Sequence, residues 1–270
     1  MSETMENETE GVTYFPFLFD FPSEKEEQKL FVAKIAVFFV TIYGLFTSLA
    51  PLKEIKLYGI YTDNEKPNPV HVYLAHKCGS VINACCVTWW CFNVWNLSAI
   101  KSLGFGNLPL IISDLHSILN DKPKELGGKS SVLYFNVMLF TAAAYHCLYE
   151  LQPLATRLFQ VQVAWGFFNG VLLFLSPEIF AKTYGIPSRE KIILTARKMY
   201  GIDLISCCIQ ASCLLAGIDG LTALAYGWLI PALLFLSMTF VTKDWDEKIP
   251  MHLVMFWPIF LTAISLYMLL

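Results

Sequence analysis

The sequence predicts an all-α integral membrane protein with eight transmembrane helices, arranged as two parallel-related four-helix units. Three observations predict this fold class: an apolar composition, eight apolar segments of membrane-spanning length, and an internal repeat. Of the 270 residues, 56% are hydrophobic and only 15% are charged, and the mean hydropathy is +0.52. A typical soluble domain carries about 25% charged residues, so the shortage of charge favours lipid as the solvent around this chain.

Eight segments match the roughly 20 apolar residues that a membrane-spanning helix needs. They cover residues 30–52, 72–95, 99–119, 132–151, 158–176, 195–218, 221–242 and 251–270. Gly104, Gly106, Pro109 and Asp114 interrupt the apolar run of the third segment, and membrane helices tolerate proline and glycine when neighbours satisfy the freed backbone groups. The chain is therefore expected to divide into an acidic non-membrane tail (1–29), a first four-helix repeat (30–151) and a second four-helix repeat (158–270).

The lysines and arginines predict how these segments are oriented. When each loop is counted together with the adjoining helix ends, 14 basic residues fall on one side of the membrane and 5 on the other. This accounts for all 19 lysines and arginines. Because cytoplasmic loops carry the excess of lysine and arginine, both termini are predicted to be exoplasmic or lumenal. The sequons at Asn7 and Asn96 fall on that side. No cleavable signal peptide is visible, so the first membrane helix is expected to target the chain.

An internal repeat is the most informative feature of the sequence. The pattern G-x4-L-[AS]-P-x4-K-x-Y-G-I begins at Gly44 and again at Gly170, 126 residues later. Farther along the chain the offset becomes 122, as between Gly79 and Gly201, which fits a longer first loop. Each copy contains four predicted spans, an even number that returns the chain to its starting side. The two halves are therefore predicted to share one orientation in the membrane.

Each copy of the pattern includes a short half-polar segment between a proline and a glycine. These segments are predicted to be structural elbows, at Pro51 and Gly59 in the first copy and at Pro177 and Gly185 in the second. Proline suits the first turn of a helix, and glycine supplies the left-handed residue after its end. The alternative interpretation is a lid or a contact with lipid headgroups at the membrane interface.

The second half resembles the DoxX-like four-helix membrane family. It fits the family pattern at four positions: Pro177, Gly185, Arg197 and Gly201. The first half has Pro51, Gly59 and Gly79 at the matching positions, but His76 or Lys77 stands where the arginine would be. The resemblance implies a four-helix bundle in each half, over residues 30–270, and it implies little about activity.

Ionisable residues inside the predicted spans are the candidate functional site, because a charge at the bilayer centre costs at least about 2.5–3.5 kcal/mol. The candidates are Asp114, His116, Asp203, Lys77 and Arg197. The repeat duplicates neither aspartate, since Leu236 stands at the position matching Asp114 and Val81 at the one matching Asp203. Two interpretations stay open: a polar intramembrane site added to a duplicated scaffold, or structural ion pairs near the cytosolic edge.

No standard catalytic motif, metal site or cofactor is expected. The sequence contains no phosphate-binding loop, no G-x-S-x-G and no H-E-x-x-H motif, and the spacing of its repeated cysteines does not suit a metal. Nucleic-acid binding is not expected at a sequence pI of 6.0. The chain is predicted to bind or move a small or lipophilic molecule between its repeats. The alternatives are an accessory subunit with membrane protein partners and a lipid-modifying enzyme with a cytosol-facing site.

Overall fold

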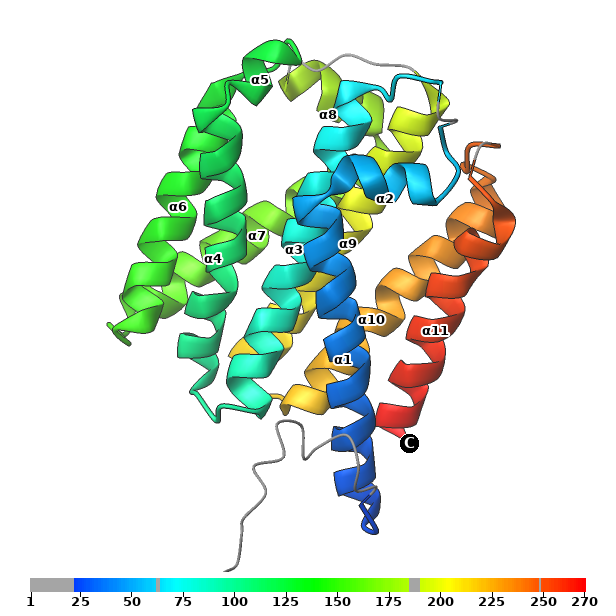
Figure 1. The fold of residues 1–270 in the computed structure, drawn as a ribbon. Coiled ribbons are helices and arrows are strands. Elements are labelled where there is room, and N and C mark those ends of the chain that lie inside the picture. The colour runs from blue at the N-terminus through cyan, green and yellow to red at the C-terminus, as the bar shows by residue number, and fades with distance from the viewer. Residues whose placement is uncertain (1–21, 62–63, 185–189, 248) are drawn as a thin grey trace, which may run out of the picture.

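The structure is a computed structural model that describes residues 22–61, 64–184, 190–247 and 249–270. Every regular element among these residues is a helix, and no strand occurs among them (Figure 1). The all-α class predicted from the sequence is confirmed.

The helices follow one another along the chain with short connections (Figure 1). Their bounds are α1 (Lys25–Leu49), α2 (Pro51–Leu57), α3 (Pro69–Asn93), α4 (Ala99–Leu119), α5 (Lys122–Glu125), α6 (Ser130–Leu148), α7 (Leu154–Leu175), α8 (Pro177–Tyr184), α9 (Lys191–Leu215), α10 (Gly220–Ser237) and α11 (Met251–Leu269). A π-helical turn, Met238–Thr242, continues α10.

Among the residues that the structure describes, four helices are long and apolar enough to cross a membrane. They are α1, α6, α7 and α10 with its π-helical continuation. The long helices α3 and α9 pack against each other in the interior of the bundle, with α1 and α4 against α3 and with α7 and α10 against α9. Because α3 and α9 are covered by other helices, they tolerate the polar side chains that lower their hydropathy.

Side-chain caps and prolines in the first turn explain where several helices begin. Asn68, Ser98 and Asp219 precede α3, α4 and α10, and each accepts a hydrogen bond from a backbone N–H of the first turn. Such caps satisfy amide groups that have no partner within the helix. Pro51 and Pro177 are the first residues of α2 and α8, where the missing N–H costs nothing.

Several helices begin a few residues before their predicted spans. α1 begins at Lys25, five residues early, because Glu26 and Glu27 in its first turn suit the positive end of the helix dipole. α4 covers the third predicted span and runs without a break through Pro109. The helices α3 and α6 pack along it, and a proline is tolerated inside a membrane helix when neighbouring groups satisfy the freed backbone group.

Two pairs of glycines mark the closest helix crossings. A Cβ atom added at Gly79 would lie 2.6 Å from the backbone oxygen of Gly44, where α3 crosses α1. A Cβ atom added at Gly201 would lie 2.6 Å from the backbone oxygen of Gly170, where α9 crosses α7. Small residues at such crossings let two helix backbones approach each other.

Candidate functional site

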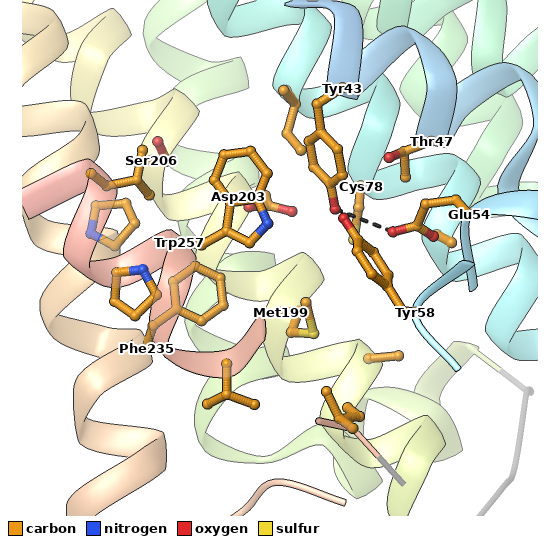
Figure 2. Close-up of a pocket in the computed structure, with 18 of the residues that line it drawn as sticks. Tyr43, Thr47, Glu54, Tyr58, Cys78, Met199, Asp203, Ser206, Phe235 and Trp257 are labelled. Carbon is orange, nitrogen blue, oxygen red and sulfur yellow. Dashed lines mark hydrogen bonds between the residues drawn. The ribbon is translucent and has the colours of Figure 1, made fainter. Parts of the chain in front are cut away.

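A first cavity of about 160 Å³ lies among α1, α2, α3, α9, α10 and α11 (Figure 2). Most of its wall is apolar and aromatic, with Ile82, Trp228, Phe235 and Trp257 among the lining residues. Its polar lining comes from Tyr43, Thr47, Glu54, Tyr58, His71, Cys78, Asp203 and Ser206. A mostly apolar cavity with a few convergent polar groups is typical of small-molecule binding sites.

Two carboxylates distinguish the first cavity. Glu54, on α2, is only 5% exposed and accepts a hydrogen bond of 3.2 Å from the Tyr43 hydroxyl (Figure 2). Asp203, on α9, keeps part of its side chain exposed, and the Cys78 thiol lies beside it. In the described part of the chain, no lysine or arginine forms an ion pair with either carboxylate. The first cavity therefore presents two acidic groups without a basic partner in an apolar wall.

Burial gives Glu54 an unusual pKa for a residue in a connecting helix. Removal from water raises the pKa of its carboxyl from the ordinary 4.5 to about 7, and the hydrogen bond from Tyr43 opposes that rise. Between these two values the folded protein holds a proton that the unfolded chain releases. The folded state is therefore stabilised by acid at this position and loses that stabilisation as the pH rises through 7.

We expect the stability of the protein in detergent to decrease as the pH rises from 5 to 8, by up to about 1.4 kcal/mol per pH unit. The Glu54→Gln variant should show a smaller decrease, because its side chain takes up no proton in either state. Thermal unfolding midpoints at several pH values measure the decrease in the wild type and in the variant.

The first cavity also holds other titratable side chains, namely Tyr43, Tyr58, His71 and Asp203, so the difference between the wild type and Glu54→Gln isolates the effect of Glu54. Glu178→Gln is the matched control, because Glu178 is exposed on α8, the second short helix that begins with a proline. An unchanged pH slope in Glu54→Gln would contradict the assignment.

A second cavity of about 130 Å³ lies among α3, α4, α6, α7, α8 and α9. Its apolar wall includes Leu110, Phe140, Trp165, Phe180 and Leu204. Its charged lining comes from Lys77, Asp114, Lys129 and Arg197. The second cavity therefore contains the three predicted site residues Lys77, Asp114 and Arg197.

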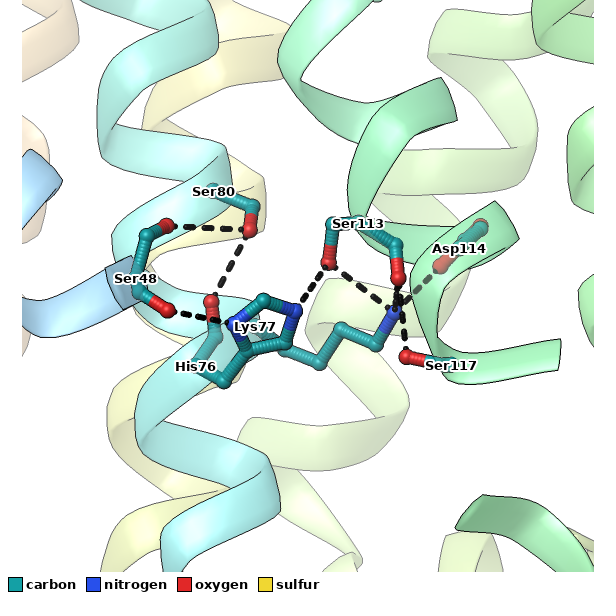
Figure 3. Close-up of polar contacts among 7 residues, drawn as sticks. All are labelled: Ser48, His76, Lys77, Ser80, Ser113, Asp114 and Ser117. Atoms are coloured by element: carbon teal, nitrogen blue, oxygen red, sulfur yellow. Dashed lines mark hydrogen bonds and ion pairs between the residues drawn. The ribbon is translucent and has the colours of Figure 1, made fainter. Parts of the chain in front are cut away.

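Lys77 and Asp114 form a buried ion pair between α3 and α4 (Figure 3). The Lys77 Nζ atom lies 2.6 Å from Asp114 Oδ1 and also donates to the Ser113 carbonyl at 3.1 Å and to the Ser113 hydroxyl at 3.0 Å. Both side chains of the pair are less than 10% exposed. The three bonds satisfy all three ammonium protons, which is what a charge inside a protein requires.

His76 connects this ion pair to α1 (Figure 3). Its Nδ1 atom lies 2.7 Å from the Ser48 carbonyl oxygen, and its Nε2 atom lies 3.0 Å from Ser113 Oγ. A carbonyl oxygen only accepts, so Nδ1 donates and Nε2 of a neutral ring accepts from the Ser113 hydroxyl. The Ser80 hydroxyl, which donates to the His76 carbonyl, completes a polar chain across α1, α3 and α4.

The structure separates residues that the sequence analysis grouped as one candidate site. Asp203 lines the first cavity, whereas Asp114, Lys77 and Arg197 line the second. His116 lines neither, since it is exposed on α4 with its ring centroid 5.4 Å from that of His76. These five residues therefore do not line one shared cavity in this structure.

Glu54, Tyr43 and Tyr58 line the first cavity but were not predicted from the sequence as site residues. The signal was the difference between the two copies of the repeated pattern, because Glu54 in the first copy matches Phe180 in the second. Of the predicted elbows, Gly59 follows α2 with a φ of 69°, a left-handed conformation that suits glycine. Gly185 lies outside the described residues.

Within the described residues, no group of three or more His, Cys, Asp or Glu side chains is placed to hold a metal ion. No family model, no curated protein and no solved structure matches this chain. The resemblance to DoxX-like proteins consequently stays a prediction, and the function has to be argued from the two cavities.

Proposed function

We propose that the chain is an eight-span membrane protein built from two related four-helix units. The order of helices supports this, because α1, α2, α3, α4 and α6 have counterparts of similar length in α7, α8, α9, α10 and α11. Pro109 and Pro231, 122 residues apart, both lie inside their helices. The close crossing of α1 with α3 at Gly79 also has a counterpart where α7 crosses α9 at Gly201.

We further propose that both termini lie on the exoplasmic or lumenal side. The Lys25 Nζ atom at the start of α1 donates a hydrogen bond of 2.8 Å to the Leu270 carbonyl oxygen, which supports a common side for the two ends. α2, α5 and α8 lie at the opposite end of the bundle (Figure 1) and carry lysines, as cytosolic ends do. Protease protection of epitope tags at Met1 and Leu270 tests this: digestion of either tag from the cytosol would contradict the orientation.

In this arrangement the first cavity binds a lipophilic molecule that carries an amine or another hydrogen-bond donor. The observation that supports this function is the pair of carboxylates, Glu54 and Asp203, in an apolar wall without a basic partner in the described chain. A buried carboxylate needs a hydrogen-bond donor or a positive charge to offset its desolvation. A ligand with an ammonium group supplies both.

The aromatic residues of the first cavity favour the same class of ligand. Trp228 and Trp257 line the wall on the side of the second unit, and Tyr43 lines it on the side of the first. Aromatic faces attract cations, by about 0.5–2 kcal/mol depending on exposure, and they also pack against an apolar chain. Asp203 is the proposed partner of the ligand's charge, because it lines the first cavity and is only partly buried, whereas Glu54 is 5% exposed.

We expect Asp203→Asn to weaken the binding of a radiolabelled long-chain alkylamine by about 10–100-fold. A hydrogen bond to a charged group contributes about 1.5–3 kcal/mol, and each 1.4 kcal/mol changes affinity tenfold. Equilibrium binding to the purified protein in lipid nanodiscs measures the loss.

Asp121→Asn is the matched control for this experiment. Asp121 is an exposed residue after α4 with a φ of 48°, a conformation that asparagine adopts readily. The same change of aspartate to asparagine at this position should leave amine binding unchanged. Equal affinities of the wild type and a folded Asp203→Asn variant would remove the proposed function.

A further inference from the structure

We propose that the first cavity exchanges a proton for its ligand: Glu54 holds a proton before the amine binds and releases it once the ammonium group is in place. This inference rests on the amine-binding function proposed above and adds the regulation of that site by pH. It follows from the position of Glu54 and from the groups that surround its carboxyl.

Glu54 is placed where an ionised carboxyl group is costly. It lies on α2, outside the predicted spans, and α2 packs against α1 and α3. Only 5% of the residue is exposed. The Tyr43 hydroxyl donates a hydrogen bond of 3.2 Å to it (Figure 2), and no described lysine or arginine forms an ion pair with it. A buried carboxylate without a cation lowers this cost by taking up a proton.

The balance between burial and the hydrogen bond leaves Glu54 able to change its charge at neutral pH. Burial raises the pKa of its carboxyl to about 7, and the hydrogen bond from Tyr43 opposes the rise. Near pH 7 the protonated and ionised forms are therefore both populated. One new charge inside the cavity is enough to shift such a group from one form to the other.

The proposed ligand brings that charge into the same cavity. Glu54 and Asp203 both line it (Figure 2), and an ammonium group held by Asp203 favours the ionised form of a second carboxyl nearby. The proton of Glu54 then passes to the solvent, while the ligand keeps its own protons. Because coupling between two binding events is reciprocal, the amine must bind more tightly where Glu54 is already ionised. Its affinity therefore rises with pH.

Other titratable side chains of the first cavity have to be separated from Glu54. They come from α1, from α2 and the residue after it, and from α3 and α9, and α10 and α11 add none among the described residues: Tyr43, Tyr58, His71, Cys78, Cys85, Cys86 and Asp203. Lys53 and Lys56, on α2 itself, are not lining residues. Tyrosine and cysteine ordinarily titrate at about pH 8.5 or above. His71 and Asp203 are therefore the groups to separate from Glu54 between pH 6 and pH 8.

The test measures the binding of dodecylamine to the full-length protein in phosphatidylcholine nanodiscs, with binding to empty nanodiscs subtracted. A primary amine titrates at about pH 10, as lysine does, so the probe stays an ammonium ion from pH 6 to pH 8. The affinity of the wild type should increase about five- to tenfold over this range, which is what ionisation of one group with a pKa of about 7 allows. Calorimetry in two buffers of different ionisation enthalpy should show about half a proton released per bound amine at pH 7.

Glu54→Gln should still bind dodecylamine, because Asp203 remains, and should lose both the pH dependence and the proton release. His71→Gln should keep both, and so should Glu178→Gln on the exposed short helix α8. A folded Glu54→Gln variant that retains the pH dependence would assign it to another group and overturn the proposal. Loss of the pH dependence in His71→Gln would do the same.

Tyr43→Phe provides the test if Glu54→Gln does not fold. The variant lacks the hydroxyl that favours the ionised carboxyl of Glu54, so the pH at which the affinity changes should move upward. The position of this change along the pH scale is the readout, whatever the substitution does to the affinity itself. An unmoved pH profile in the folded variant would contradict the proposal.

Failure of the coupling and failure of the amine site give different results. If dodecylamine binds and Asp203→Asn weakens its binding, but the affinity is equal at pH 6 and pH 8 and no proton is released, only the coupling is wrong. If dodecylamine binds at none of these pH values, the amine site and the coupling are both wrong.

Discussion

Asp114→Ala is expected to lower the free energy of unfolding by about 3–5 kcal/mol. The substitution leaves the Lys77 ammonium group buried, with its side chain only 5% exposed, and removes its one carboxylate partner. The two remaining acceptors, both on Ser113, are uncharged. Thermal unfolding of the detergent-solubilised variant measures the loss.

The double variant Lys77→Met/Asp114→Leu should recover most of that stability. Methionine and leucine are the residues at the matching positions of the second half, Met199 and Leu236. Replacing a buried ion pair with apolar residues of similar volume is often neutral or stabilising. A double variant no more stable than Asp114→Ala would show that the pair itself is not the source of the effect, and a fully stable Asp114→Ala would show that Lys77 needs no partner.

The class and order of the helices are readable from the sequence because they depend on local patterns. Apolar segments of about 20 residues predict membrane-length helices, and prolines such as Pro51 and Pro177 mark the start of the short helices between them. Polar residues that must pair inside a membrane also limit the possibilities. Structural ion pairs were one of the two interpretations of the candidate site, and the structure pairs Asp114 with Lys77.

The division into two cavities could not be predicted from the sequence, because it depends on the rotation of each helix about its own axis. Lys77 and Cys78 are neighbours on α3, yet Lys77 lines the second cavity and Cys78 lines the first. Consecutive residues of a helix point about 100° apart, so α3 is a wall shared by both cavities. Which face of α3 meets α4 and which meets α9 is set by packing between distant segments, and the apolar periodicity of a span gives little information on it.

Glu54, on the short helix α2, is a second residue whose burial could not be predicted from the sequence. Its sequence context, a half-polar segment after a predicted span, indicates an elbow at the membrane interface. Its burial against Tyr43 depends on how α2 folds back over the end of α1 and α3. Only the comparison with Phe180 in the second copy gives a sequence-level reason to single it out.

Gly79→Ala and Gly201→Ala are each expected to destabilise the protein by about 1–3 kcal/mol, the usual cost of overpacking. At each position the added Cβ atom would meet backbone atoms of the facing helix: Ser48 N at 2.5 Å and Gly44 O at 2.6 Å for Gly79, and Gly170 O at 2.6 Å for Gly201. A backbone cannot move aside as a flexible side chain can, so the helices would have to separate.

The double variant Gly79→Ala/Gly201→Ala should lose about the sum of the two effects, because α1 with α3 and α7 with α9 form two distinct crossings and distant sites add. Gly227→Ala is the matched control, since its Cβ atom would lie 3.1 Å from the Gln210 Cβ atom and no closer than 3.5 Å to a backbone atom, that of the Ser206 oxygen. It gains the same helix propensity of about 0.5–1 kcal/mol. Unfolding midpoints compare all four proteins. If the two crossings descend from one duplicated unit, the single variants should lose similar amounts. A stable Gly201→Ala beside an unstable Gly79→Ala would instead indicate that the crossing of α7 with α9 is not equivalent to that of α1 with α3.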